Sequence, residues 1–291
     1  MPFDLQWHLF NHTVTPILLY GSEVWGFEPC EAVDVFHRKF LKQQLRLKRS
    51  TPSCMIYGDT GQVKLSLMAE KRLLLFWFRM AYPSGIQSKL THAMYKIMRH
   101  LHDRQGVEFR WGAKVRTLLE DYGMGHLWNP EDNPGVSLQW FKAAISLRIE
   151  DVFKQNWRAE VWEKSACVNY RIFKTEHQNE ANLLKLEKRH AEVIFKFRCA
   201  NFPLPVYENQ SHTQLRLNSK ECPLCHFDVG DEFHFLLVCP ALRTERETLL
   251  PRYYFTNPNV IKFTQIMSSQ KIRLLKSLAL FLFQIKSKLS S

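Results

Sequence analysis

Three cysteines and a histidine stand close together near the C-terminal end of the sequence, in the order Cys222, Cys225, His234 and Cys239. A Cys-x2-Cys turn can direct two thiolates at one ion, and a histidine and a cysteine from a following element can complete a tetrahedron. The chain has only seven cysteines in 291 residues, so this local density stands out. Because four protein ligands leave no coordination position for water, the spacing predicts a structural zinc site and not a catalytic one.

The segment around His234 has the features of a short helix that packs beneath this site. Asp231 is suited to capping its first turn. His234 and Cys239 are five residues apart, about 140° around an ideal helix, so a continuous helix would separate them. Pro240 disfavours helical geometry at Cys239, which allows the sulfur to turn back toward the imidazole. We expect Asp231, Glu232 or a backbone carbonyl to hold the imidazole ring from outside the metal's ligand set.

Two alternatives concern the same residues. The cluster could consist of ordinary buried thiols, and His226, which adjoins the second cysteine, could compete with His234 as a ligand. The other cysteines lie alone among apolar or helical residues, where a thiol acts as a small hydrophobic group. We therefore expect no metal ligation by Cys30, Cys54, Cys167 or Cys199.

A zinc enzyme is a third alternative. His190 and Glu192, followed by the Cys222–Cys225 pair, imitate the zinc deaminase signature H-x-E…P-C-x-x-C, in which a glutamate moves protons. However, Glu221 stands where that signature has proline, and His234 and Cys239 would be left without a role. His190 also lies within an apolar stripe of helical spacing, which favours a half-buried helix residue.

Positive charge is concentrated in two stretches that contain no acidic residue. Lys and Arg outnumber Asp and Glu by 40 to 28, which gives a net charge of +12. The first stretch, 35–58, contains Arg38, Lys39, Lys42, Arg46, Lys48 and Arg49. The second follows Glu247, and its candidate binding residues are Lys271, Arg273 and Lys276. Unopposed positive charge favours binding to a phosphate backbone, because such binding releases counterions from the nucleic acid. RNA or DNA is therefore the predicted partner, and a membrane is not. A solvated basic surface without a partner is the alternative.

The first basic stretch also has an amphipathic pattern. On a helix its apolar residues would face a core while a row of cations, spaced by about one turn, would face solvent. The apolar side would hold Phe36, Phe40 and Leu47, and the cationic side Arg38, Lys42, Arg46 and Arg49. Such a row can follow a phosphate backbone but cannot read bases, so binding should be largely independent of sequence. Trp25 or Trp111 could add base stacking, or belong to the core.

Helical periodicity dominates the remainder of the chain. Stripes at helical spacing occur in three places, represented by Leu138 to Phe153, Leu183 to Phe197 and Leu275 to Leu289, and convincing strands are scarce. We predict a mainly α fold of helical bundles with little or no sheet. The predicted parts are a helical region 1–124, a Pro- and Gly-containing linker 125–137, and a helical region 138–291 that contains the zinc element 222–239.

No targeting signal is expected, and the apolar windows are too short and too closely flanked by charge to span a bilayer. The windows 73–78 and 278–285 are therefore predicted to be core helices. Seven cysteines without a signal peptide indicate a reducing compartment, so we expect a nuclear or cytoplasmic protein.

Several segments resemble non-LTR (LINE-type) retrotransposon reverse transcriptases. CPLC…DEFHFLLVCP, followed by Arg243 and Arg246, is similar to the cysteine–histidine segment near the C-terminus of that family. LLYGSEVWG (18–26) resembles the stretch after the polymerase domain, and the similarity continues through 36–80 and again through RHAEVIFKFRCANFPL (189–204).

The resemblance implies a segment that helps to grip template RNA or target DNA during target-primed reverse transcription. Polymerase chemistry needs paired carboxylates for two divalent ions, and the sequence has no Asp-Asp pair; Tyr57-Gly58-Asp59 is followed by Thr60. We therefore expect a non-catalytic, nucleic-acid-binding fragment, equivalent to the C-terminal third of such a protein. The alternatives are a zinc-stapled protein-interaction module and a functionless remnant of a decayed element.

Overall fold

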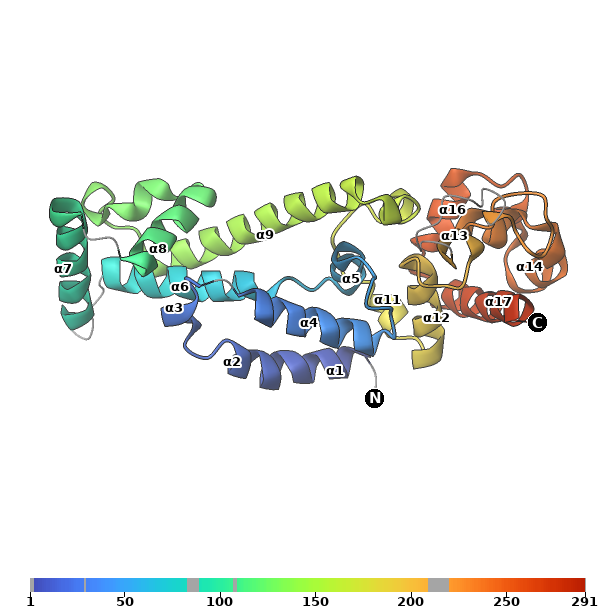
Figure 1. Ribbon diagram of the computed structural model, residues 1–291, viewed down its shortest axis with the longest axis horizontal. Helices are drawn as coiled ribbons and strands as arrows, with labels where there is room; N and C mark the ends of the chain where they lie inside the picture. The colour runs from blue at the N-terminus through green and yellow to red at the C-terminus, as the bar shows by residue number, and fades with distance from the viewer. Residues whose placement is uncertain (1–2, 29, 83–88, 107–108, 209–219, 291) are drawn as a thin grey trace. The chain divides into compact units, whose positions relative to one another are not determined.

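The computed structural model describes residues 3–28, 30–82, 89–106, 109–208 and 220–290. Within these ranges the named elements are all helices (Figure 1). The β pairing that the described residues show is an isolated antiparallel bridge between Glu221 and Val229. The prediction of a mainly α fold with little or no sheet is therefore confirmed. None of the described helices combines the length and hydropathy that a bilayer crossing requires.

The contacts divide the chain into two compact units. Unit 1 comprises residues 1–8, 38–62 and 157–291, and unit 2 comprises residues 9–37 and 63–156. The helices of unit 2 are α2 (Thr15–Leu18), α3 (Ser22–Trp25), α6 (Leu65–Ala81), α7 (Lys89–Gln105) and α8 (Arg110–Asp121). Those of unit 1 are α5 (Ser53–Thr60), α10 (Tyr170–Phe173), α11 (Ala181–Leu184), α12 (Lys188–Arg198), α13 (Pro205–Glu208), α14 (Arg243–Leu249), α15 (Arg252–Phe255), α16 (Val260–Met267) and α17 (Ile272–Ser290). The division falls within α1 (Phe3–Leu9), α4 (Glu31–Gln44) and α9 (Leu138–Glu163).

Aromatic packing forms the core of unit 2. The apolar window 73–78 lies in α6, and its buried residues face α8 and the first part of α9, as expected for a core helix. Phe78 stacks on Phe141 with ring centroids 4.3 Å apart, and Trp77 stacks on Trp128 at 6.0 Å. The helical stripe predicted for 138–153 is confirmed, because Phe141 and Phe153 are buried on one side of α9.

The division of the chain differs from the predicted domain boundaries. The predicted linker 125–137 lies inside unit 2, where it forms two short 3₁₀ turns, Gly125–Trp128 and Pro130–Asp132. Leu127 is buried, and Trp128 packs against the same core. A Pro- and Gly-containing stretch therefore serves here as a packed connection, because its two large apolar residues contribute to the core.

The LLYGSEVWG segment has a structural role in unit 2. Gly21 has φ +68°, and a Cβ at Gly26 would lie 2.3 Å from the Ser22 carbonyl oxygen. The Arg72 guanidinium donates a hydrogen bond of 2.6 Å to the Leu19 carbonyl. Glycine is required at Gly21 by backbone conformation and at Gly26 by space, so that α3 can pack against α6.

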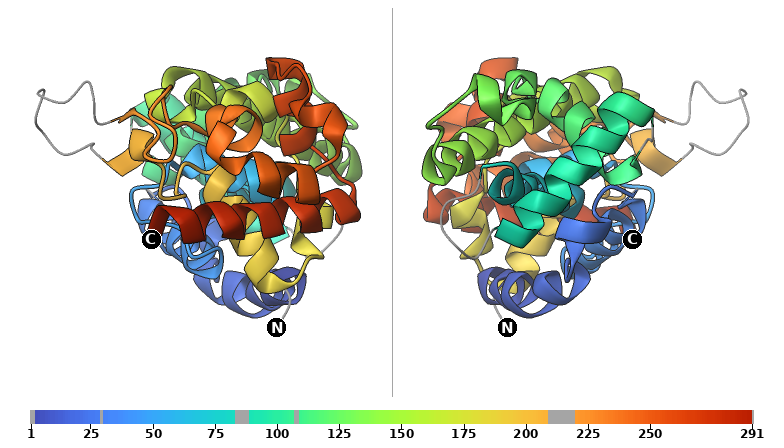
Figure 2. Two further views of the ribbon diagram at one scale, coloured as in Figure 1. Left: turned by 90° about the vertical axis from the view of Figure 1, so that its right-hand side faces the viewer. Right: turned by 90° about the vertical axis from the view of Figure 1, so that its left-hand side faces the viewer.

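In unit 1 the long helix α17 packs against α12 and α14 (Figures 1 and 2). Its predicted stripe is confirmed, because Leu275, Leu278, Leu282 and Ile285 are buried. The stripe predicted from Leu183 to Phe197 belongs to two helices, because α11 ends at Leu184 and α12 begins at Lys188. Its apolar positions are buried nonetheless, since both segments turn toward α17.

Candidate metal centre and nucleic-acid interface

The four predicted ligands come together in unit 1. The sulfurs of Cys222, Cys225 and Cys239 and one ring nitrogen of His234 all lie within 4.8 Å of one another. The Cys222 and Cys239 sulfurs are 3.8 Å apart, and His234 Nε2 is 3.3 Å from the Cys225 sulfur. Zinc–sulfur bonds of about 2.3 Å in a tetrahedron place two sulfurs about 3.8 Å apart. The described geometry therefore fits a four-ligand zinc site.

A tight turn presents the first two cysteines. The Cys222 amide donates to the Asp228 carbonyl at 2.8 Å, and the His226 amide donates to the Cys222 carbonyl at 2.9 Å. His226 has φ +58° and its side chain is exposed. The turn directs His226 away from the cluster, so His234 is the histidine that the fold brings to the sulfurs.

The second half of the site is a short helix with a wide turn. Asp231 Oδ1 accepts a hydrogen bond of 2.8 Å from the His234 amide, which confirms the predicted cap. His234–Val238 forms a π-helix, and the Cys239 amide donates to the His234 carbonyl at 2.8 Å. This i→i−5 pattern rotates less per residue than an α-helix and brings positions five apart toward one side. Cys239 then leaves helical geometry, at φ −47° and ψ 118°, directly before Pro240, as predicted.

The imidazole is oriented differently from our expectation. Glu232 accepts from Asn169 and Tyr207 instead, and Asp231 is engaged with the backbone. His234 Nδ1 is buried without a hydrogen bond, 3.9 Å from the Asp228 carboxylate. The expectation that Asp231 or Glu232 holds the ring is therefore wrong, because both carboxylates have closer partners.

Burial controls the protonation of the cluster. It lowers the pKa of His234, which favours the neutral imidazole that metals require. It also raises the pKa of Cys222, and that of Cys239 to about 12. Both thiols therefore hold their protons in the metal-free fold, and a metal must displace those protons to bind.

Arg246, on α14, holds the backbone of this element in place. Its guanidinium donates to the carbonyls of Leu236, Phe235 and Cys239 at 2.9, 3.3 and 3.1 Å. The side chain is buried, and the charge lies 5.9 Å from the centre of the Phe281 ring. The sequence marks Arg246 only as part of a resemblance; the structure shows that it satisfies three carbonyls around the candidate site.

The deaminase alternative is not supported by the positions of its residues. His190 is absent from the metal-ligand cluster that the described residues form, and its ring lies 5.8 Å from Phe283. Glu192 forms an ion pair of 3.3 Å with Arg46. Neither side chain is placed to serve a metal held by Cys222 and Cys225.

A second buried polar cluster surrounds Asp59. The Arg198 guanidinium makes two hydrogen bonds of 2.8 Å to the Asp59 carboxylate and one of 2.9 Å to Glu180. Tyr170 donates to Asp59 at 2.9 Å, and Lys174 donates to Glu180 at 2.6 Å. Burial alone would raise the pKa of Asp59, but Arg198 holds it below its ordinary value. Both oxygens of the Asp59 carboxylate accept hydrogen bonds from Arg198 or Tyr170, so neither is free to bind a catalytic metal ion.

The helical row of cations predicted for the first basic stretch is wrong. α4 ends at Gln44, and Arg46, at φ +52°, lies in the following turn with Arg49. Lys42 donates to the Arg49 carbonyl at 2.6 Å. Burial, with the nearby charges of Arg38 and Lys164, lowers the pKa of Lys42. Lys42 and Arg46 are therefore engaged within the protein.

Tertiary contacts set the end of this helix. Leu45 and Leu47 are buried, whereas Phe36, which we expected to face a core, is 48% exposed. Asn201 Oδ1 accepts from the Lys48 amide at 2.6 Å and from the Thr51 hydroxyl at 2.9 Å. This clamp fixes the turn. The side chains of Lys48 and Arg49, and that of Lys39 on α4, are exposed.

The two acid-free stretches meet in unit 1. Burial lowers the pKa of Lys196, on α12, and the positive charges of Lys286 and Arg46 lower it further against the opposing effect of Glu192. Lys286 belongs to α17, and Arg46 to the turn after α4. Positive charge from both ends of the sequence is therefore gathered around α12.

Two of the predicted tail cations line a pocket of about 950 Å³ in unit 1. Lys271 and Arg273 line it together with Tyr253 and Tyr254, and the described lining residues include no carboxylate. Tyr253 is 55% exposed, and Lys262 lies 4.8 Å from the centre of its ring. Lys276 follows Arg273 by one turn of α17 and is exposed.

Of the two roles predicted for Trp25 and Trp111, base stacking or core packing, their contacts favour core packing. Trp25 and Trp111 donate through their indole nitrogens to the Tyr20 and Glu23 carbonyls, at 2.7 and 3.2 Å, and serve the packing of unit 2. The aromatic residues beside the tail cations are tyrosines. Both tyrosines, Tyr253 and Tyr254, belong to the acid-free stretch after Glu247. An aromatic pair within a basic segment is the sequence feature that could have pointed to them.

No protein-family model, curated protein or solved structure matches this chain. The resemblance to non-LTR retrotransposon reverse transcriptases therefore rests on the quoted sequence segments.

Proposed function

We propose that this chain is a non-catalytic nucleic-acid-binding segment, stapled by structural zinc, of the kind that the resemblance to non-LTR retrotransposon reverse transcriptases implies. Its role would be to grip template RNA or target DNA through the phosphate backbone. Zinc would fix the C-terminal part of unit 1, and exposed cations and tyrosines of that unit would contact the strand.

The four converging ligands support the zinc component. Three sulfurs and one imidazole nitrogen lie within 4.8 Å of one another, and four such ligands would fill a tetrahedral zinc shell and leave no position for a reacting water. When bound, zinc would join the turn that carries Cys222 and Cys225 to the helix that carries His234 and to Cys239, which follows that helix directly. The candidate site is thus suited to holding structure and not to hydrolysis.

The acid-free pocket beside Tyr253 and Tyr254 is the observation that carries the nucleic-acid component. Lys271 and Arg273 provide charge for phosphates, and an exposed tyrosine ring provides a face on which any base can stack. Basic grooves with aromatic platforms bind single strands with little sequence preference. A surface that was merely solvated would normally mix both signs of charge.

Salt-dependent binding tests this proposal. Fluorescence anisotropy with labelled single-stranded RNA, single-stranded DNA and duplex DNA should show affinity that falls steeply with salt and varies little with sequence. Changing Lys271, Arg273 and Lys276 together to serine should reduce the salt slope by about 0.7 for each phosphate of a single strand that is no longer neutralised. The matched control removes three exposed cations of unit 2 in the same way: Arg79, Lys142 and Arg148. Equal slopes for the two triple variants would contradict the proposal.

A second pair of variants separates stacking from charge. Tyr253→Ala should weaken single-strand binding about fivefold or more with the salt slope unchanged, whereas Tyr253→Phe should retain binding. Metal analysis should show the same zinc content in all these variants, because none of them touches the four ligands. If Tyr253→Ala and Tyr253→Phe bind alike, the ring does not serve as a platform.

An apolar pocket in unit 2 favours one competing function, a zinc-stapled protein-interaction module. This pocket has a volume of about 450 Å³ and is lined by Val24, Phe76, Met80, Met94, Met98 and Trp111, among others. Flexible methionine side chains are common at surfaces that accept apolar partners. The salt titration distinguishes the two functions, because an apolar interface does not release counterions and would leave no salt-dependent binding to RNA or DNA.

A further inference from the structure

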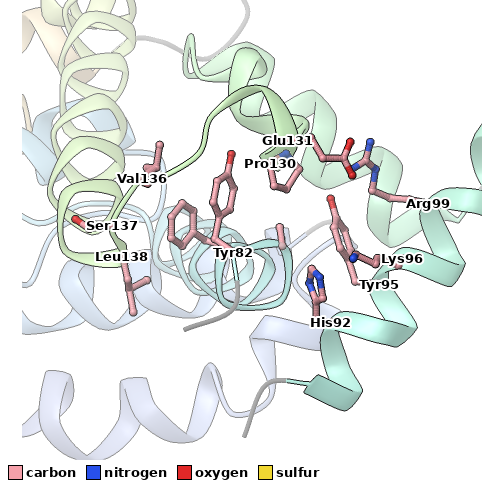
Figure 3. Close-up of a pocket in the computed structure, with 13 residues that line it drawn as sticks. Tyr82, His92, Tyr95, Lys96, Arg99, Pro130, Glu131, Val136, Ser137 and Leu138 are labelled. Carbon is pink, nitrogen blue, oxygen red and sulfur yellow. The ribbon is translucent and has the colours of Figure 1, made fainter. Parts of the chain in front are cut away.

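Unit 2 contains a polar pocket of its own, separate from the zinc site and from the basic pocket of unit 1. It has a volume of about 540 Å³ and lies between the end of α6, one face of α7, the turn at 130–131 and the start of α9 (Figure 3). Figure 3 shows Tyr82 in the middle of the lining, with Val136 to Leu138 on one side and the side chains of α7 on the other. The pocket is large enough for a nucleotide-sized ligand.

Tyr82 provides a rigid aromatic wall. One face of its ring stacks on Phe78, with centroids 4.4 Å apart and planes within 7° of parallel. Its hydroxyl donates to the Leu127 carbonyl at 2.8 Å, and burial raises the pKa of Tyr82 to about 12. With one face packed and the hydroxyl bound, the ring cannot rotate freely, and its other face lines the pocket (Figure 3). A planar ligand could continue this stack.

Donors for an anion come from α7. Arg99 Nη2 donates to Asn129 Oδ1 at 2.9 Å, which holds the guanidinium in place, while Arg99 Nε is buried without a partner. Lys96 is exposed and adds a second positive charge to the lining. A buried donor without a partner destabilises the fold, so a ligand that accepts from Arg99 Nε would remove that cost. Among the described lining residues, Glu131 is the single carboxylate.

We propose that this pocket binds a nucleoside monophosphate, with its base stacked on Tyr82 and its phosphate at Lys96 and Arg99. An inorganic anion would leave the aromatic wall unused, and a purely apolar ligand would leave Arg99 Nε unsatisfied. A ligand with a flat ring at one end and a phosphate at the other satisfies both ends of the pocket. The same unit occurs as a free nucleotide and at the phosphorylated end of a strand.

Isothermal titration of the full-length, zinc-loaded chain tests the ligand class. AMP should bind at least about tenfold more tightly than either adenosine or inorganic phosphate, because each of these lacks one of the two contacts. A 5′-phosphorylated tetranucleotide distinguishes the two sources. Tighter binding than AMP would identify a strand end as the ligand, and weaker binding would identify the free nucleotide. Equal binding of adenosine, phosphate and AMP would overturn the proposal.

Charge variants test the phosphate end of the pocket. Lys96→Glu should weaken AMP binding about tenfold or more, whereas Arg104→Glu, an exposed position of the same helix outside the pocket, should leave it unchanged. Glu131→Gln should strengthen AMP binding, because it removes a negative charge beside the phosphate. A purely structural role for these exposed side chains predicts no gain. If Glu131→Gln and Lys96→Glu both leave the affinity unchanged, the phosphate does not bind there.

Ring variants test the stacking end. Tyr82→Leu should weaken AMP binding about fivefold or more, and Tyr82→Phe should retain most of it. Thermal unfolding identifies any Tyr82 variant that fails to fold. In that case the charge variants at the exposed positions Lys96 and Glu131 decide whether AMP binds in this pocket. The result is independent of the proposed strand binding by unit 1, because the triple variant at Lys271, Arg273 and Lys276 leaves this pocket intact. Loss of AMP binding in that triple variant would instead place the nucleotide in unit 1 and overturn the assignment.

Discussion

Two buried polar clusters in unit 1 differ in whether the protein alone satisfies them. Around Asp59, two carboxylates meet two cations, and Tyr170 and Gln270 supply further hydrogen bonds. Around Cys222, three sulfurs and an imidazole meet only one another in addition to backbone amides, and His234 Nδ1 has no hydrogen bond. The charged groups of the first cluster are all buried and the second cluster is buried except at Cys225, yet only the first is complete.

The difference shows how a ligand-binding cluster can be recognised among structural ones. Burying charge is tolerated when each charge is paired and hydrogen-bonded, and Arg198 and Asp59 meet that condition. Three thiols and a neutral imidazole gain little from one another, so their convergence at tetrahedral spacing has no explanation within the chain. A bound metal ion would supply the missing partner.

The largest expected effect is the loss of zinc. Structural zinc contributes on the order of 10 kcal/mol of apparent binding free energy in small domains. Cys239→Ser should therefore lose zinc and lower the helix content of the purified chain, and chelation of the parent protein should do the same. Cys199→Ser is the matched control, because Cys199 is a buried thiol beside the Asp59 cluster, 3.9 Å from its carboxylate. Full zinc retention in Cys239→Ser, measured by metal analysis, would refute the assigned ligand set.

Next in size is the removal of the central cation of the complete cluster. Arg198→Met leaves Asp59 and Glu180 buried without their shared guanidinium, and breaking such a buried pair costs about 3–5 kcal/mol. Chemical denaturation should show this loss while the zinc content is unchanged. Arg243→Met removes an exposed arginine paired with Glu247 and should cost less than about 1 kcal/mol. Comparable losses in the two variants would show that the Asp59 cluster contributes little.

Acidification should affect the two clusters over different ranges of pH. Zinc binds cysteine as the thiolate, so it must displace one proton from each of Cys222, Cys225 and Cys239, and affinity should fall about a thousandfold for each pH unit below neutrality. Asp59 has a lowered pKa, so its contribution to stability is present above its ordinary value of 3.8 and is lost as the pH falls through the lower folded value. Zinc release should therefore precede unfolding of the Asp59 cluster. Simultaneous loss of zinc and helix signal near pH 3 would contradict this order.

The smallest effect should come from the removal of a single hydroxyl group. Tyr170→Phe removes a donor to Asp59 and to the Met55 carbonyl, at 2.9 and 3.1 Å, while Arg198 still binds the carboxylate. We expect a loss of about 1–2 kcal/mol in the free energy of unfolding, measured by urea titration, with zinc content unchanged. A loss as large as that of Arg198→Met would mean that the hydroxyl and the guanidinium act as one cooperative unit.

Features whose information is local could be predicted from the amino-acid sequence. The four candidate ligands lie within eighteen residues, and Pro240 directs Cys239 back toward the site through its effect on the preceding backbone. Apolar periodicity likewise predicted the core faces of α9 and α17, because each face is repeated along one helix.

Tertiary structure alone decided the features that depend on distant partners. Asp59 and Arg198 are 139 residues apart, and Asn201 fixes the turn at Lys48 from 153 residues away. The pattern after Gln44 is compatible with a longer helix, but burial of Leu45 and Leu47 and the Asn201 clamp favour a turn. No local pattern encodes such pairings, because each is stabilised only after the chain has brought the two segments together.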